Sequence, residues 1–261
     1  MNFKALAAAA ALVAAAPSFA LTLGTASTGS SVFLNVVEEN TTQTSYELDL
    51  NLSVATFNDA GTYSWTLTGD TWNTFLATVQ AGGDMSSLQW SVNANKLVNA
   101  GQQFVYTTAA DGTLASDLAV RNSAVVGIVN DVTSYEQKIN SNLDATGLAS
   151  TAGSTSPAYW AYSENDTLNS KLNSSVMNSV GTASSLYKIA VTPKTAGGAT
   201  YFATTLATVT ASAGSFNLTN TAGVYTLTYT QPSAAVPEAS TLAMLLAGLG
   251  FVGFIARRRA A

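Results

Sequence analysis

The side chains in this sequence that could perform acid–base chemistry are carboxylates, because the chain contains neither histidine nor cysteine. Thiolate nucleophiles, imidazole metal sites and histidine-based catalytic triads are therefore excluded. A glycoside hydrolase needs two carboxylates about 5–10 Å apart, one on each side of the sugar bond. The acidic pairs that stand close together in the sequence are Glu38/Glu39, Glu47/Asp49 and Glu164/Asp166.

Glu47 and Asp49 would lie about 7 Å apart on one face of a strand, because alternate residues of a strand point the same way. The polar face of any half-buried strand carries such residues, so we interpret this pair as a solvated strand face. Glu164-Asn165-Asp166 lacks the remaining ligands of a calcium-binding loop. The sequence therefore predicts a protein that is not an enzyme, with no catalytic residue, metal or cofactor.

A second type of chemistry is stacking of aromatic rings on sugars. Tyr159, Trp160 and Tyr162 follow Pro157 in a segment that reads as a loop, where an exposed platform could form. Packing of these three rings in the core is the alternative, and we favour it. Trp65 and Trp90 fall on the apolar faces of expected strands and are assigned to the core.

Composition limits the classes of partner. Charged residues make up 10% of the 261 residues, compared with about 25% in an average soluble protein. Between the apolar ends of the chain, six basic residues face fourteen acidic ones, which gives a net charge of −8. The chain has no basic patch, so nucleic-acid binding is not expected.

Residues 1–20 have the organisation of a secretory signal peptide. Lys4 supplies a positive start, residues 5–16 are apolar, and Ala20 ends a segment of small residues. The apolar part has about 12 residues, whereas a membrane-spanning helix needs about 20. We therefore expect export and cleavage after Ala20.

Residues 21–231 are expected to form the extracytoplasmic core, which begins with a loose leader over residues 21–31. The clearest strand is residues 46–54, where apolar and polar residues alternate. With its neighbours it predicts an antiparallel meander that has one solvated face. The further strands are expected at residues 32–36, 63–67, 88–92, 103–107, 187–191 and 200–209, with a hairpin over 216–229.

Two segments of the core have helical spacing. Residues 71–80 predict a short helix, and residues 116–142 carry one apolar stripe, with Ser116 or Asn122 as a candidate cap. A weaker helical pattern covers residues 166–180, and residues 149–156 read as a loop. The expected fold is mainly β: an antiparallel β-sandwich-like core with one or two inserted helices.

The C-terminal end has three parts. Residues 232–241 form a linker, residues 242–256 are free of charge, and Arg257, Arg258 and Arg259 follow within the last segment, 257–261. As a helix, the uncharged stretch would be about 22 Å long, a tight fit to a hydrocarbon core of about 30 Å. The three arginines predict a single transmembrane helix with its C-terminus in the cytoplasm.

The short motif ahead of this helix, together with the helix and the arginines, resembles the PEP-CTERM sorting signal of Gram-negative bacteria. That family's motif is typically Val-Pro-Glu-Pro-Ser-Thr, and here Ala239 replaces the second proline. The motif residues are Val236, Pro237, Glu238, Ala239, Ser240 and Thr241. The resemblance implies secretion, transient anchoring in the inner membrane, cleavage by an exosortase, and a final place in the envelope or an exopolysaccharide matrix.

Three hypotheses for the core follow. The leading one is a structural or adhesive surface or matrix protein in an exopolysaccharide or biofilm context. The alternative is a carbohydrate-binding module that uses the loop aromatics. A glycoside hydrolase that uses a carboxylate pair ranks last.

Overall fold

The structure is a computed structural model that describes residues 20–82, 84–160, 168, 170–172, 174–194 and 200–231. The predicted signal peptide up to residue 19, the sorting motif, the segment 242–256 and the terminal arginines lie outside the described residues. Contacts divide the chain into two units, residues 1–230 and 231–261. The fold below is that of the first unit.

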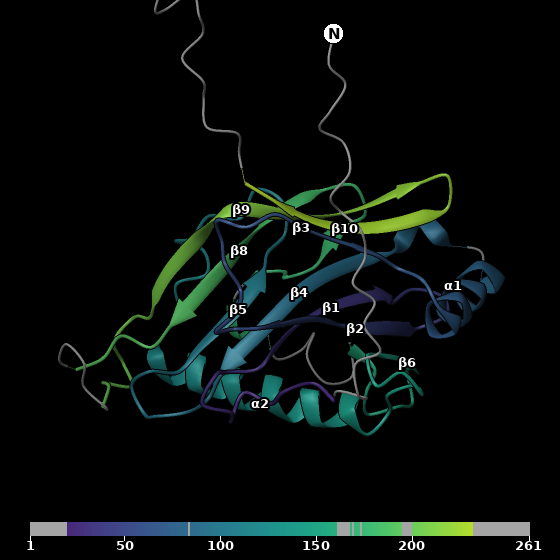
Figure 1. Cartoon of the computed structure of the whole chain (residues 1–261). Helices are drawn as coiled ribbons and strands as arrows, with labels where there is room; N and C mark the ends of the chain where they lie inside the picture. Colours follow the sequence, from purple (N-terminus) through teal and green to yellow (C-terminus); the bar gives the residue numbers. More distant parts are fainter. Residues whose placement is uncertain are drawn as a thin grey trace, which may run out of the picture. The chain divides into compact units, whose positions relative to one another are not determined.

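Within the described residues, ten strands form one antiparallel sheet that curls into a half-barrel (Figure 1). The sheet order is β3-β10-β9-β8-β5-β4-β1-β2-β6, and β7 pairs with β4 beside this path. The strands are β1 (Ser31–Glu38), β2 (Thr44–Ser53), β3 (Tyr63–Thr66), β4 (Gln89–Lys96), β5 (Phe104–Thr108), β6 (Ala149–Gly153), β7 (Asn178–Ser179), β8 (Ala183–Ala190), β9 (Thr208–Thr221) and β10 (Val224–Thr230).

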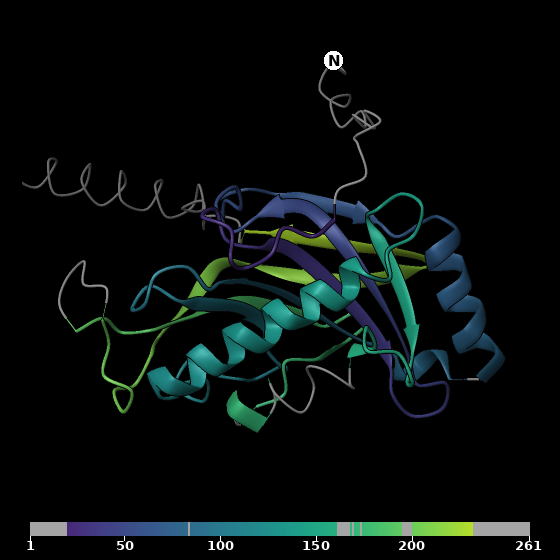
Figure 2. The ribbon, with the colours of Figure 1, turned by 90° about the horizontal axis from the view of Figure 1, so that it is seen from below.

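Two long helices accompany the sheet. Helix α2 lies across one face of the sheet and α1 packs near β2 and β6 (Figure 2). The helical elements are α1 (Asp70–Gly82), the 3-10 turn η1 (Met85–Ser87), α2 (Asn122–Asn140) and the short α3 (Ser170–Leu172). No helix in the described part of the chain has the length and apolar character needed to cross a membrane.

Strand β1 is buried on both of its faces, which explains why its residues are apolar at consecutive positions. Val32, Leu34 and Val36 belong to a cluster inside the curl, which also contains side chains of β9 and β10. Phe33 and Val37 belong to a second cluster, beneath α2. The mainly-β antiparallel expectation is confirmed, but the core is one curled sheet whose inner face is filled by its own side chains and those of α1, whereas a sandwich has two sheets.

The expectation of one solvated sheet face is wrong, because α2 covers that face. Asn35, Glu47, Asn93 and Asn95 on β1, β2 and β4 are all at most 1% exposed. Asn95 donates from its side-chain amide to the Val129 carbonyl of α2 over 3.0 Å. The alternation in the sequence therefore marks a polar layer buried between sheet and helix.

Helix α1 confirms the predicted helix over 71–80, whereas α2 begins six residues later than expected, at Asn122. Neither expected cap acts as one, because Arg121 occupies the cap position without a side-chain hydrogen bond. The Asn122 amide instead donates to the carbonyls of Thr192 and Phe202. This tertiary contact ties the start of α2 to a distant segment.

Strand β6 lies within the segment expected to be a loop, residues 149–156. Its Ser/Thr/Gly-rich sequence is a poor strand signal, and it forms a strand because it pairs with β2 from Thr44 to Leu48. Of the weak helix expected over 166–180, the described residues contain α3, and β7 occupies part of the remainder.

The expectation of a loose leader over residues 21–31 is wrong, because residues 20–30 form an ordered N-terminal strap and Ser31 begins β1. The strap lies against α2 and β4, with Leu21 only 3% exposed. Leu21 exchanges two hydrogen bonds with the Asn140 side chain, and Gly24 N–H donates to Glu136 Oε2 over 2.9 Å. A Cβ at residue 24 would lie 1.7 Å from Asn95 Oδ1, so this close approach needs glycine.

Truncation of Leu34, which is fully buried inside the curl, tests the role of this cluster. We expect Leu34→Ala to lower the free energy of unfolding by about 2–5 kcal/mol, because it removes buried methyl groups and leaves a cavity. Leu114→Ala is the matched control, because Leu114 is 64% exposed. Denaturant unfolding measures both, and equal small effects would contradict the described core.

Candidate functional site

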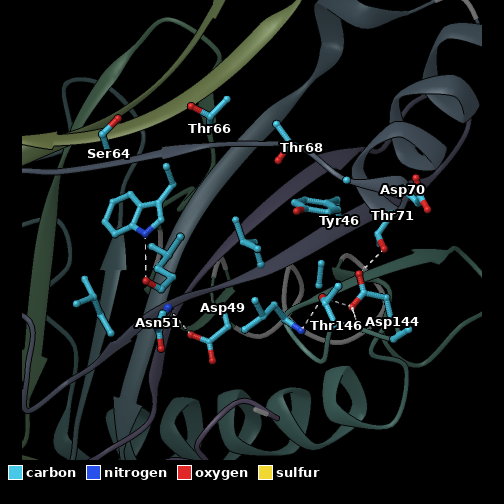
Figure 3. Close-up of a pocket in the computed structure, with 18 of the residues that line it drawn as sticks. Tyr46, Asp49, Asn51, Ser64, Thr66, Thr68, Asp70, Thr71, Asp144 and Thr146 are labelled. Carbon is cyan, nitrogen blue, oxygen red and sulfur yellow. Dashed lines mark hydrogen bonds between the residues drawn. The ribbon is translucent and has the colours of Figure 1, made fainter. Parts of the chain in front are cut away.

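The two ends of the curled sheet approach each other and leave a cleft between them (Figure 3). Strand β3 is one end of the sheet order, and β2 with β6 is the other. Trp65 Nε1 on β3 donates to the Leu50 carbonyl of β2 over 3.1 Å, across the gap. We call this space, with a volume of about 940 Å³, the edge cleft.

A bulge in β2 shapes one wall of the edge cleft. The register with β1 shifts between the pairs Val32↔Leu52 and Phe33↔Asp49, which leaves Leu50 and Asn51 as inserted residues. Asn51 adopts a positive φ of 55°. The bulge interrupts the regular ladder, and the Leu50 carbonyl becomes the acceptor for Trp65.

Asp49 is held at this bulge by two hydrogen bonds. Its Oδ1 accepts from Asn51 N–H over 2.8 Å, and its Oδ2 accepts from the Ser31 hydroxyl over 3.0 Å. Burial raises the pKa of Asp49 above its usual value, and these hydrogen bonds offset part of that effect. Asp49 is therefore a positioned acceptor on the wall of the cleft.

Asp144 closes the other end of the edge cleft, next to the start of α1 (Figure 3). Its carboxylate accepts hydrogen bonds from the hydroxyls of Thr71 and Thr146. Partial burial would raise the pKa of Asp144, but these hydrogen bonds outweigh it and lower the pKa below its usual value. Asp144 is thus an ionised group that fixes the loop after α2 to α1.

Tyr63 and Trp65 supply the aromatic part of the edge cleft. Both are half-buried on β3, with ring centroids 5.7 Å apart and planes inclined by 16°. Behind them, Trp65 packs against Phe216 at 6.3 Å. The rings are therefore fixed in place before any ligand arrives.

The polar groups of the edge cleft are hydroxyls, an amide and carboxylates from Asp49, Asp70 and Asp144. None of the described residues that line it is Lys or Arg. Such a surface accepts hydrogen bonds and repels anions. Aromatic rings beside hydrogen-bonding groups suit a neutral ligand that carries many hydroxyl groups.

Glu47, one member of the pair read as a solvated strand face, is buried beneath α2 at 1% exposure, and Asp49 is 8% exposed. The solvated-face interpretation is therefore wrong. Glu47 Oε1 accepts hydrogen bonds from the hydroxyls of Tyr135 and Ser45. Burial raises the pKa of Glu47 to about 7, although hydrogen bonds from Ser45 and Tyr135 lower it.

A second buried carboxylate, Glu136, faces the strap from α2 at 0% exposure. Burial raises its pKa to about 8, and the hydrogen bond from Gly24 N–H opposes the shift. Within the described residues, neither Glu47 nor Glu136 forms a salt bridge. Both carboxyls are therefore held partly in the neutral form near pH 7.

The other acidic pairs singled out in the sequence are Glu38/Glu39 and Glu164/Asp166. Glu38 accepts backbone hydrogen bonds from residues 40–43 at the turn after β1. Burial would raise the pKa of Glu38, but these bonds hold it at about 2. Glu164 and Asp166 lie outside the described residues, and the described part of the chain contains no cluster of three or more acidic side chains that could hold a metal ion.

Two of the three aromatic residues considered for sugar stacking lie in the core. Trp160 is 0% exposed and packs edge-on against Tyr135 at 5.4 Å, and Tyr159 is 5% exposed. Neither ring offers an open face to a sugar, which agrees with the packing alternative. Tyr162 lies outside the described residues.

The sequence did not indicate the edge cleft. Trp65 was assigned to the core, and the regular alternation through Leu50, Asn51 and Leu52 hides the bulge. Asp144 follows α2 in a loop without a recognisable motif. The one local signal for this region is the Gly69-Asp70 pair, which marks a turn where α1 begins.

Comparison with known proteins identified a PEP-CTERM protein-sorting motif at residues 235–259. This match covers the C-terminal end only and says nothing of the edge cleft. Neither the curated proteins nor the solved structures contain a match to the chain.

The buried carboxyls predict a pH dependence of stability. In the unfolded chain their pKa is about 4.5, whereas in the fold it is about 7 for Glu47 and about 8 for Glu136. The folded state therefore holds these protons more tightly. The contribution of the two carboxyls to the free energy of unfolding is fully present below about pH 4.5, and it is lost as the pH rises through their folded pKa values of about 7 and 8.

We expect the free energy of unfolding of Glu47→Gln to fall less steeply with pH, by up to about 1.4 kcal/mol per pH unit. Glutamine keeps a side-chain oxygen that accepts hydrogen bonds, but it cannot ionise. Urea unfolding from pH 5 to pH 9 measures the effect. Asp111→Asn, a change at an exposed turn, is the control. Parallel profiles for wild type and Glu47→Gln would refute the assignment.

Proposed function

We propose that this chain, which carries a PEP-CTERM protein-sorting motif, is a surface or matrix protein with a structural or adhesive role. The motif at residues 235–259 is the observation that carries the proposal. It implies an exported protein that is sorted to the cell surface and processed by an exosortase. We propose that the chain is held in the inner membrane until cleavage near Pro237-Glu238 and is then released to the envelope or an exopolysaccharide matrix.

We also propose that the core acts without catalysis. The acidic pair with strand spacing supports this, because Glu47 is beneath α2 and out of reach of a sugar bond. Glu38 supports it as well, since its oxygens are engaged by the backbone of the following turn. A hydrolase that uses Glu47 would have to move α2, and one that uses Glu38 would have to break the turn after β1.

The sorting proposal is tested by changing Pro237-Glu238 to Ala-Ala in the producing organism. We expect unprocessed protein to accumulate in the inner membrane, because the protease would lose its recognition motif. Cell fractionation and intact-mass measurement detect this. Pro232→Ala is the matched control, because Pro232 lies in the same linker but outside the matched residues. Normal processing of the Ala-Ala variant would refute the proposal.

A second proposal concerns the ligand of the core. The edge cleft, and not the loop aromatics, supports binding of a neutral polysaccharide. Its half-buried Tyr63 and Trp65 stand beside hydroxyl, amide and carboxylate groups, and its lining contains no described cation. Sugar hydroxyls could donate to the carboxylates, whereas an acidic polymer would be repelled by them.

Trp65→Ala should weaken such binding by up to about tenfold, because it removes ring contact worth ~0.5–1.5 kcal/mol. Affinity electrophoresis through gels containing a β-glucan, a mannan or a galactan measures retardation, with a polyuronate as the acidic comparison. Phe202→Ala, at a ring that is 54% exposed and outside the cleft, is the control. The proposal is wrong if no neutral polymer retards the protein or if the polyuronate retards it more.

A further inference from the structure

The strap meets α2 at the last residue of that helix. Leu21 N–H donates to Asn140 Oδ1 over 2.7 Å, and Asn140 Nδ2 donates back to the Leu21 carbonyl over 2.9 Å. The Leu21 side chain is buried, whereas Ala20 is exposed. The side-chain amide of Asn140 therefore binds both the N–H and the carbonyl of Leu21.

Leu21 is also the residue that the expected signal-peptide cleavage after Ala20 would leave at the N-terminus. Cleavage by hydrolysis turns the Leu21 amide nitrogen into an α-ammonium group and leaves the carboxylate on Ala20. We propose that the Asn140 side chain, at the C-terminal end of α2, is a binding site for this new α-ammonium group. The proposal rests on the expected cleavage point and not on the sorting motif or the edge cleft.

The end of a helix is a favourable place for a cation. The aligned peptide groups of α2, 19 residues long, give its C-terminal end a partial negative charge. An ammonium group keeps the donor that Asn140 Oδ1 already accepts and gains two further N–H donors. Those donors reach solvent, because Ala20, the residue that cleavage removes, is exposed.

Titratable groups of both kinds lie on the elements around this position, and the acidic group of α2 nearest Asn140 in the sequence, Glu136, has a pKa raised to about 8. On α2, Glu136 lies one turn before Asn140 and binds the strap through Gly24 N–H. Asp49 of β2 acts electrostatically on Glu136. Two cations oppose them, Lys138 in the last turn of α2 and Lys96 at the end of β4.

Processing thus supplies a positive charge on the residue that Asn140 holds, three residues before Gly24, whose N–H binds Glu136. A chain that begins two residues earlier keeps an uncharged amide N–H at Leu21 as the donor to Asn140. The cleavage point, and not the presence of a free terminus, then determines how firmly the strap holds α2 to the sheet.

The test compares two chains made with defined first residues, one starting at Leu21 and one starting at Phe19, both ending at Ala261 and kept in detergent micelles. The two carry equal charge and differ in where the ammonium group stands. Each is also made with Asn140→Ala, and with Asn130→Ala as a control at an exposed asparagine of the same helix. Proton NMR titration gives the pKa of the α-amino group, and thermal unfolding gives stability against pH.

We expect the pKa of the α-amino group to be about 7.7–8.0 in the longer chain, and about 0.5 higher when Leu21 is first. Asn140→Ala should cancel this difference and Asn130→Ala should keep it. Since the folded pKa is raised, the chain starting at Leu21 should unfold at a higher temperature below about pH 7.7, and this advantage should disappear as the pH rises through the raised value.

Equal pKa values in the two chains would overturn the proposal. The proposal would also be overturned if Asn140→Ala lowered the unfolding temperature of both chains equally. Asn140 would then stabilise the strap whether or not the ammonium group is on Leu21. Because the first residue is set in advance, the result does not depend on processing in cells. Failure of the signal-peptide assignment would appear separately, as a different N-terminal mass in the exported protein.

Discussion

The fold depends on α2 covering the face of the sheet that carries Asn35, Glu47 and Asn95 beside an apolar cluster. Buried polar groups cost free energy unless they are hydrogen-bonded, so the helix must bring partners for the strands that it covers. It does so through Tyr135, which donates to Glu47, and through the Val129 carbonyl, which accepts from Asn95. The N-terminal strap completes the layer by donating Gly24 N–H to Glu136. Helix, strap and sheet therefore form one hydrogen-bonded unit.

The second constraint is the curl of the sheet. Because α2 occupies the outer face of the central strands, the inner face is buried by other elements: β9 and β10 fold over toward β1 and β2, and α1 adds Trp72, Phe75 and Val79. The curl stops short of closure, because β3 at one end of the sheet order pairs only with β10 and not with β2 or β6 at the other. Trp65 crosses the remaining gap between β3 and β2 by its hydrogen bond to the Leu50 carbonyl. The edge cleft is a direct consequence of this incomplete closure.

Local patterns in the sequence predicted the elements that depend on local chemistry. The helix over 70–82 and the hairpin of β9 and β10 follow from apolar spacing and from the Ala222-Gly223 turn, where both residues have positive φ. The features that depend on tertiary contacts were not predicted from the sequence. Strand β6 forms only because β2 is beside it, and α2 starts where Asn122 meets Thr192. The edge cleft needs both sheet ends at once, and no local pattern encodes their meeting.

Alternation of polar and apolar residues carries a general ambiguity that this chain illustrates. The pattern around Glu47 predicts two unlike faces, but it does not say what covers the polar one. The same alternation is compatible with a polar face covered by solvent and with one covered by a helix that carries polar side chains. The low charge of the chain, 10% of its residues, favours the second solution, because few ions must be desolvated when a face rich in Ser, Thr and Asn is covered. The two carboxyls that are buried there, Glu47 and Glu136, accordingly have raised pKa values and no salt bridge to a described residue. The composition that argues against a nucleic-acid partner is thus also what allows a helix to close this sheet.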